Sequence, residues 1–189
     1  MNEIHNKRLI FVFTGPDGSG RKTVAQKVGA LCELQRVLSY TTRPSRLYEK
    51  DGVDYHFITP EQFIEAEQNN EFIETLEMEG VFYGIKSIEV EAMFQKHPYV
   101  YLILNRQGSK LVKDAYGDKV IQIMIYADRN KVMSRLLERG DTTEVIYKNL
   151  DRYEQEMGYS KECDANVENY DLDDTVEEVT EILKSYILK

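Results

Sequence analysis

The chain has 189 residues, 42% hydrophobic and 30% charged, which predicts one globular domain and argues against a disordered chain. It has no run of about 18 apolar residues, so a membrane-spanning helix is not expected. Its 24 basic and 33 acidic residues give a net charge of −9, which disfavours binding to nucleic acid or to an anionic membrane surface.

A strand, a glycine-rich loop and a helix open the chain. Residues 9–13 (LIFVF) are a short apolar run rich in β-formers, which predicts a buried strand. Three glycines follow within residues 15–20, and apolar residues recur at helical spacing from Thr23 to Leu34. A glycine loop between a strand and a helix is a place where backbone N–H groups bind phosphate.

Strands and helices alternate along the rest of the chain. Continuous apolar runs predict buried strands at 99–104 and 120–126. Apolar residues at helical spacing predict helices at 88–94, 109–116, 129–138 and 173–188. This alternation predicts an α/β fold with a parallel sheet.

Two segments interrupt the alternation. Residues 39–86 hold short strand-like pieces around one helix at 60–69, and residues 129–158 are charged and helical with a break at Gly140. Both are predicted to be insertions around the core sheet of a single domain, 1–189. The core then comprises three segments, namely 1–38, 87–128 and 159–189.

The glycine loop resembles the P-loop pattern G-x-x-x-x-G-K-[ST], with two departures. Its residues are Gly15, Pro16, Asp17, Gly18, Ser19, Gly20, Arg21, Lys22 and Thr23. Arg21 stands at the lysine position, and Lys22 stands where the pattern has a hydroxyl. An arginine places its charge differently from a lysine, and a lysine cannot ligate Mg²⁺ as a hydroxyl does. We still expect the loop to bind the phosphates of a nucleotide.

Four further runs give the chain a family resemblance. They are SYTTRPSR at 39–46, DGVDYHF at 51–57, NEFIE at 70–74 and FYG at 82–84. Together with the glycine loop, and in this order along nearly the whole chain, they resemble the guanylate kinase family of P-loop nucleoside monophosphate kinases.

The resemblance implies a fold, a reaction and two substrates. The expected fold is a P-loop NTPase-type parallel sheet flanked by helices, with residues 39–86 as a GMP-binding insertion and 129–158 as a helical lid. The expected reaction moves the γ-phosphate of ATP to GMP, with ATP and Mg²⁺ as cofactors. The expected oligomeric state is a monomer or a homodimer, with no nucleic-acid or membrane partner.

The resemblance also implies a GMP site. By position, the expected guanine-binding residues are Ser39, Glu74 and Asn105, and the expected phosphate clamp is Arg43, Arg46, Tyr55 and Tyr83. The physical reason for Glu74 is that guanine presents two donors on one edge, which a single carboxylate accepts together. Adenine presents the opposite pattern there and would leave the carboxylate unpaired.

On the ATP side, the resemblance implies binding by the loop and by three distant residues. Arg135 and Arg139 are expected to meet the ATP phosphates from the lid, and Asn169 is expected near the adenine. The residues expected to act in catalysis are Arg21, Lys22, Arg43, Arg135 and Arg139. No protein ligand for a metal is predicted.

Several departures from the family pattern fall on the phosphoryl-transfer side. Ile103 and Asn105 stand where the family has two carboxylates, although Asn105 retains a carbonyl that could accept from guanine. Asn149 replaces a further lid arginine. Arg152 follows one turn later, about 4.5 Å along the helix axis, and is the candidate to substitute for it.

Two functions from different classes are consistent with these departures. One is an active or weakly active guanylate kinase with a rearranged phosphate site, and the other is a catalytically silent guanine-nucleotide-binding or protein-interaction module. A kinase of another small phosphate ester is disfavoured by Ser39 and Glu74. The two cysteines, Cys32 and Cys163, lie far apart without metal-ligand spacing, and residues 1–8 show no signal-peptide pattern, so a cytoplasmic location is expected.

Overall fold

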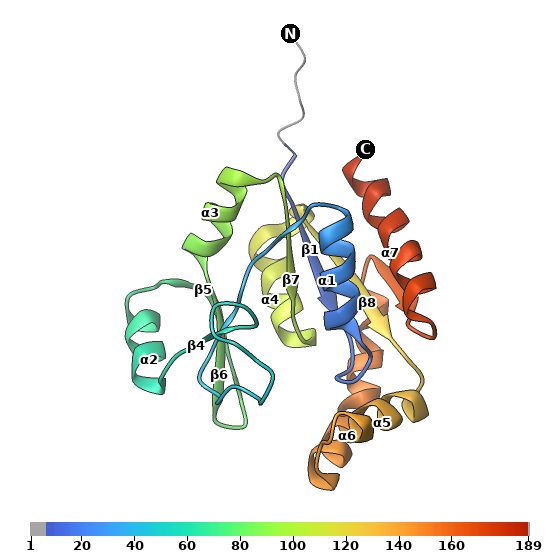
Figure 1. Ribbon diagram of the computed structural model, residues 1–189. Coiled ribbons are helices and arrows are strands. Elements are labelled where there is room, and N and C mark those ends of the chain that lie inside the picture. Colours follow the sequence, from blue (N-terminus) through green and yellow to red (C-terminus); the bar gives the residue numbers. More distant parts are fainter. Residues whose placement is uncertain (1–6, 189) are drawn as a thin grey trace.

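The computed structural model describes residues 7–188, so most of the segment in which no signal peptide was expected lies outside the described residues. Its central sheet has five parallel strands in the order β2-β7-β1-β8-β9 (Figure 1). The strands are β1 (Leu9–Thr14), β2 (Gln35–Arg36), β7 (Tyr99–Ile103), β8 (Val120–Tyr126) and β9 (Ala165–Glu168).

Helices cover both faces of this sheet, which confirms the predicted α/β fold (Figure 1). On one face Phe11 and Phe13 pack with residues of α1 (Arg21–Leu31) and α7 (Leu172–Ile187). On the other face Ile10 and Val12 pack with residues of α3 (Ser87–Lys96) and α4 (Arg106–Tyr116). Every residue of β1 is buried, which is why its sequence is continuously apolar and does not alternate.

Residues 39–86, called the insertion below, carry a second sheet of four strands in the order β4-β3-β6-β5. Its elements are β3 (Tyr40–Thr41), β4 (His56–Phe57), α2 (Pro60–Gln68), β5 (Phe72–Met78) and β6 (Val81–Lys86). Phe63 of α2 is fully buried against the sheet, with its ring centroid 4.4 Å from that of Phe72 and 5.3 Å from that of Phe82. The insertion therefore has its own small core.

Two antiparallel helices, α5 (Arg129–Glu138) and α6 (Thr143–Gly158), form a hairpin below the sheet in Figure 1. The turn between them passes through Gly140, whose φ of 83° is in the left-handed region that favours glycine. The facing sides of the two helices make a third apolar cluster that includes Val132, Leu136 and Ile146. Short 3₁₀ turns, η1 (Gly117–Lys119) and η2 (Tyr159–Glu162), precede β8 and follow α6.

The main differences from the sequence-based expectations are at element ends. The helical spacing extended to Leu34, but α1 ends at Leu31 because Glu33 adopts a left-handed φ of 54°. The Leu34 N–H then donates to the Gly29 carbonyl at 2.8 Å, which is the pattern of a Schellman cap. The strand β2 was not predicted, since two residues are too short to show a period. Within the described residues, no helix combines the length and apolarity needed to cross a bilayer.

Candidate functional site

The glycine loop lies at the carboxyl end of β1, where parallel strands leave a crevice that binds ligands. Gly15 has a φ of 131°, and a Cβ there would meet the Ile125 carbonyl oxygen at 2.0 Å. Gly20 is the N-cap of α1, with a φ of 86°, and no side chain of this residue accepts a hydrogen bond from the first amides of the helix. Ser19 is fully buried and its Oγ has no partner. These features fit a loop whose backbone receives phosphate.

A side chain at Gly20 would be unfavourable for two reasons: its φ of 86° is strained for other residues, and a Cβ would collide with Asn169. A Cβ would lie 2.3 Å from Asn169 Nδ2, whereas Gly140, with the similar φ of 83°, has nothing within 4 Å. We expect Gly20→Ala and Gly140→Ala both to lose about 1–3 kcal/mol of stability from backbone strain.

Only Gly20→Ala should also weaken ATP binding, by about tenfold, since Asn169 must move away from the loop. Thermal unfolding and ATP calorimetry on both variants check this. Equal ATP affinities in the two variants would contradict it.

The two cations of the loop are both engaged. The Arg21 guanidinium donates to the Gly15 carbonyl and so folds back over the loop. Lys22 Nζ lies 2.5 Å from Asp54 Oδ1 in the insertion. Thr23 is exposed on the first turn of α1. The Arg21 side chain therefore lies against the glycine loop, whereas the Lys22 side chain extends to the insertion.

The carboxyl end of β9 and helix α5 close over the loop from the other side. Arg135 of α5 donates to the carbonyls of Ser19 and Asn169, both at 2.9 Å. The buried Asn169 side chain donates through Nδ2 to the same Ser19 carbonyl at 2.7 Å. The predicted ATP-side residues from three distant segments thus meet at one turn of the loop.

A second arginine of the hairpin contacts the loop through a carboxylate. Arg139 lies 3.1 Å from Asp17 Oδ2 and also pairs with Asp141. Burial alone would raise the pKa of the Asp17 carboxyl, but the guanidinium groups of Arg21 and Arg139 outweigh it and lower the pKa. Asp17 therefore carries its charge at neutral pH and links α5 to the loop.

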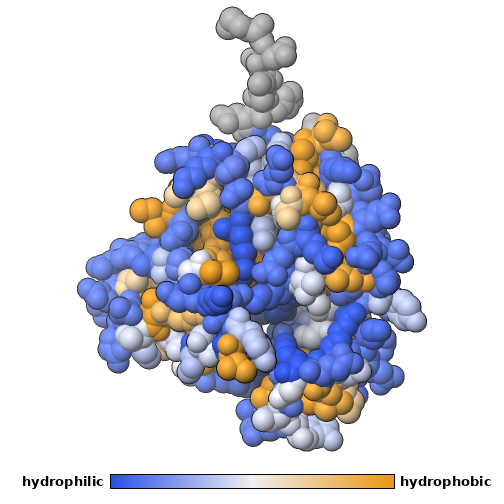
Figure 2. All heavy atoms as spheres, in the orientation of Figure 1, coloured by the Kyte–Doolittle hydropathy of each residue, from blue (hydrophilic) through white to orange (hydrophobic). Residues whose placement is uncertain are grey.

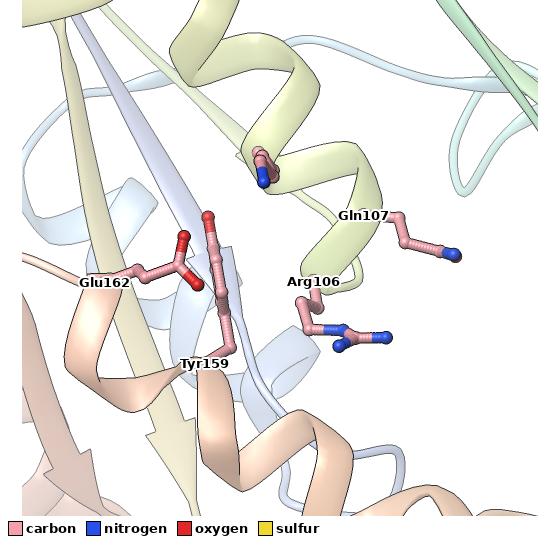
Figure 3. Close-up of a pocket in the computed structure, with 5 residues that line it drawn as sticks. Arg106, Gln107, Tyr159 and Glu162 are labelled. Carbon is pink, nitrogen blue, oxygen red and sulfur yellow. The ribbon is translucent and has the colours of Figure 1, made fainter.

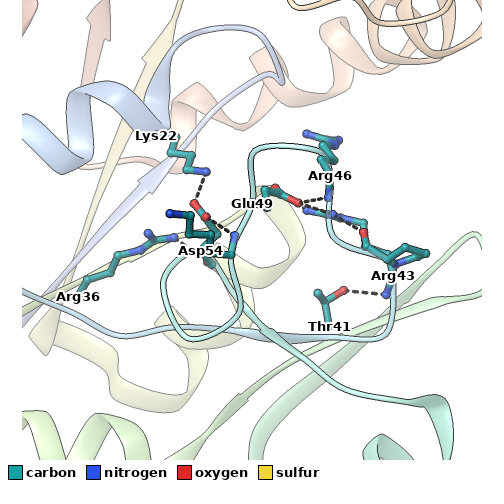
Figure 4. Close-up of polar contacts among 9 residues, drawn as sticks. Lys22, Arg36, Thr41, Arg43, Arg46, Glu49 and Asp54 are labelled. Carbon is teal, nitrogen blue, oxygen red and sulfur yellow. Dashed lines mark hydrogen bonds and ion pairs between the residues drawn. The ribbon is translucent and has the colours of Figure 1, made fainter.

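Arg43 and Arg46, two of the residues predicted to clamp the GMP phosphate, lie on one loop of the insertion (Figure 4). Arg43 forms a bidentate pair with Glu49, at 2.7 and 2.8 Å, and its guanidinium lies over the Tyr55 ring at 5.1 Å. Tyr83 meets Tyr55 edge to face, with ring centroids 6.5 Å apart. The exposed Arg46 donates its backbone N–H to Glu49 at 2.9 Å. The two arginines of the predicted clamp thus contact the same carboxylate.

Glu49, which contacts two of the predicted site residues, was not itself predicted from the sequence. Burial would raise the pKa of its carboxyl, but hydrogen bonds from Arg43 and from the Arg46 backbone lower the pKa. The carboxylate fixes the Arg43 guanidinium in one orientation. The available signal was an acidic residue three positions after Arg46, within the same short loop.

The predicted guanine-binding residues come from three elements. Ser39 is 8% exposed, and its carbonyl accepts the His56 N–H at 2.9 Å. Glu74 lies on β5 opposite Ile85, and its side chain is outside the described part of the structure. Asn105 caps α4: its Oδ1 accepts the Gly108 N–H at 2.9 Å. One lone pair of that oxygen remains, so the guanine role of Asn105 stays a prediction.

The residues present do not fit a magnesium ion held by the protein. Lys22 is a cation at the hydroxyl position, and Ile103, at the end of β7, packs against the apolar core. Asn105 uses its oxygen to cap α4. Within residues 7–188, no cluster of three or more His, Cys, Asp or Glu side chains has a metal-binding arrangement.

In the hairpin, Asn149 is half-buried on α6, and Arg152 follows on the same helix. Arg152 pairs with Glu79, in the turn between β5 and β6. It therefore links the hairpin to the tip of the insertion. Its proposed substitution for the missing arginine remains a prediction.

A separate cavity of about 230 Å³ lies between the start of α4 and η2 (Figure 3). Its lining residues are Arg106, Gln107, Lys110, Tyr159 and Glu162. None of them is among the predicted nucleotide-binding residues. In the space-filling view the surface is hollowed elsewhere, between the insertion and the hairpin (Figure 2). Of the predicted site residues, Arg43, Arg46, Tyr55 and Tyr83 belong to the insertion, and Arg135 and Arg139 belong to the hairpin.

Comparison with known proteins agrees with this arrangement. A guanylate kinase of Salinibacter ruber is 37% identical over 184 residues, which cover 95% of this chain and 97% of that protein. A guanylate kinase of Streptococcus mutans is 34% identical over 94% of this chain and 86% of its own length. The crystal structure of the Anaplasma phagocytophilum guanylate kinase superposes with a TM-score of 0.77 at 27% identity, covering 97% of this chain and 88% of that one.

The sequence profile described as guanylate kinase matches residues 7–186, which include the glycine loop, the insertion and the α5–α6 hairpin. Because the match covers nearly the whole chain, and relatives above 30% identity align over more than nine-tenths of it, the chain belongs to the guanylate kinase family.

Proposed function

We propose that this chain is a phosphotransferase that moves the γ-phosphate of ATP to GMP, giving ADP and GDP. The observation that carries the proposal is that one glycine loop contacts both groups of residues, those predicted to bind ATP and the insertion predicted to bind GMP. The glycine loop meets Arg135 and Asn169 on one side, and through Lys22 it contacts the insertion that holds the Arg43 clamp on the other. Membership in the guanylate kinase family supports the same reaction.

In the proposed complex, ATP lies along the loop with its phosphates on the amides of α1. The α5–α6 hairpin acts as the lid, and Arg135 and Arg139 bring positive charge to the transferring group. GMP lies against the insertion, with its phosphate on Arg43, Arg46, Tyr55 and Tyr83, and its base read by Ser39, Glu74 and Asn105. Phosphoryl transfer then needs alignment and positive charge, without a covalent enzyme intermediate.

The substitutions that depart from the family pattern remove charged groups from the site, and the remaining residues of this chain replace that charge only in part. Arg21 keeps a cation on the loop, although its guanidinium is bulkier than an ammonium. Mg²⁺ typically accompanies ATP in this family, but its protein ligands are not present here, so ATP itself would have to hold the ion. We therefore expect turnover below that of a chain with the full family pattern.

The deciding experiment is a coupled assay of ADP formation from Mg·ATP, with GMP, dGMP and AMP as acceptors. We expect turnover with GMP and a kcat/KM for AMP lower by about 100-fold or more. No ADP formation with GMP, alongside calorimetric GMP binding, would overturn the kinase proposal in favour of the silent binding module. Equal turnover with AMP would remove the guanine assignment.

Glu74 gives a prediction for base recognition. We expect Glu74→Gln to weaken GMP binding by about tenfold or more, because one acceptor oxygen becomes a donor and a charged hydrogen bond contributes roughly 1.5–3 kcal/mol. Glu77→Gln, an exposed position on the same strand β5, is the matched control and should leave GMP affinity unchanged. Calorimetry with GMP checks both variants. A GMP affinity of Glu74→Gln equal to that of Glu77→Gln would remove Glu74 from the base site.

We also propose a cytoplasmic location and a monomer or homodimer. The support for the compartment is the pair of free cysteines, Cys32 and Cys163, since oxidising compartments favour disulfides.

A further inference from the structure

One ion pair connects the glycine-loop side of the core to the insertion. Lys22, on the first turn of α1, places Nζ 2.5 Å from Asp54 Oδ1 (Figure 4). The Asp54 side chain is only 9% exposed, and its second oxygen accepts the Lys50 N–H at 2.9 Å. The carboxylate therefore closes its own turn and binds the core at the same time.

A second core element holds the same turn. Arg36 of β2 donates to the carbonyls of Val53 and Asp54, at 2.9 and 2.8 Å. The three contacts come from two separate core elements and converge on two consecutive residues of the insertion. Such a convergence restricts both the distance and the tilt of the turn relative to the glycine loop.

The fixed turn leads directly into the acceptor clamp. Tyr55 follows Asp54, its ring lies under the Arg43 guanidinium, and Tyr83 meets it edge to face. The Gly52 N–H donates to the Tyr55 carbonyl at 2.9 Å, so the turn and the clamp move together. A shift of Asp54 would therefore shift the residues proposed to bind the GMP phosphate.

Removing only one partner of the Lys22–Asp54 ion pair is expected to be unfavourable. Burial would raise the pKa of the Asp54 carboxyl, but the Lys22 ammonium and the Lys50 backbone N–H lower the pKa, so Asp54 is ionised at neutral pH. Removing the ammonium leaves a largely buried carboxylate without its cation, which is unfavourable. The turn would then move toward water.

We propose that Lys22 is a positioning residue: through Asp54 it fastens the insertion to the glycine loop and holds the acceptor clamp beside the donor phosphates. The inference rests on the proposed function for the identity of the acceptor, GMP. It assigns the residue at the hydroxyl position of the loop a role on the acceptor side, and it removes Lys22 from the set of ATP ligands.

The test compares Lys22→Met, Asp54→Asn and the double variant with Lys27→Met as the matched control. Lys27 lies on the same helix and pairs at 3.8 Å with the exposed Asp173. Calorimetry measures GMP and ATP separately, without turnover. We expect each single variant to weaken GMP binding by about tenfold, and the double variant to be no worse than either, because the two residues act through one contact. ATP affinity should change by less than about twofold in each variant, as should GMP affinity in Lys27→Met.

A loss of ATP affinity in Lys22→Met with GMP affinity unchanged would overturn the inference, and so would additive effects in the double variant. Amide hydrogen exchange gives a second readout that needs no nucleotide. We expect the amides of Gly52, Val53 and Asp54 to exchange faster in Lys22→Met but not in Lys27→Met. The unfolding temperature of both variants shows whether a change in exchange is local or reflects a loss of overall stability. Unchanged amide exchange in Lys22→Met would overturn the inference, even if GMP failed to bind. Absent turnover in the wild type would contradict only the proposed function.

Discussion

Arg135→Ala is expected to lower kcat/KM for ATP by about 10²–10³-fold, the usual cost of removing one preorganised charge-stabilising donor. The guanidinium joins the Ser19 carbonyl to the Asn169 carbonyl, so its charge is already fixed beside the loop before ATP binds. GMP affinity measured without ATP should not change, since Arg135 contacts the glycine loop and the end of β9, not the predicted GMP-binding residues. Steady-state kinetics with ATP varied, together with GMP calorimetry, separates the two effects.

The matched control is Arg129→Ala, which removes an exposed arginine from the first turn of the same helix α5. Arg135→Lys should recover only part of the activity, because an ammonium lacks the planar fork that reaches two diverging carbonyls. Turnover of Arg135→Ala equal to that of Arg129→Ala would show that Arg135 only fastens α5 to the loop.

The distribution of charge explains how an acidic protein binds two nucleotides. The chain carries a net charge of −9, yet, against the effect of burial, Arg21 of the loop, Arg139 of the hairpin and Arg46 of the insertion all lie near enough to Asp17 to lower the pKa of its carboxyl. Several of the arginines are paired with carboxylates, such as Arg43 with Glu49 and Arg139 with Asp17. In each pair the carboxylate fixes the orientation of the guanidinium group, and the two opposite charges nearly cancel. Incoming phosphates would then compete for donors that are already oriented, which favours positioning over long-range attraction.

Much of the core could be predicted because its signals are local. The run at 9–13 is apolar on both faces, which only a strand covered by helices on each side can satisfy. Asn169 directly follows β9, and the carboxyl ends of parallel strands share one edge, so its approach to the loop that follows β1 is consistent with the topology. The expected end of the first helix was wrong because periodicity does not register the left-handed Glu33 that stops it.

The contacts that define the site in detail could not be predicted. Glu49 is six residues from Arg43, and no spacing rule for loops makes them a bidentate pair. The partner of Lys22 lies 32 positions later, in a turn whose place depends on the folding of the insertion around Phe63. Sequence alone therefore left Lys22 in the ATP site, where the loop pattern places it. Only the three-dimensional position of Asp54 offers another role.

Arg21→Ala is expected to lower kcat by about 100-fold or more while leaving GMP affinity almost unchanged, because it removes the loop cation that is not paired with Asp54. Arg21→Lys should instead turn over at or above the wild-type rate, since an ammonium at this position carries its charge as a point that reaches between phosphates. The guanidinium now donates to the Gly15 carbonyl, and ATP binding must redirect it. The engagement of Lys22 by Asp54 makes Arg21 the residue on which this role falls. Steady-state kinetics with Mg·ATP and GMP on the wild type and both variants measures the effect. Wild-type turnover in Arg21→Ala would show that the cation beside the transferred phosphate comes from the hairpin arginines alone.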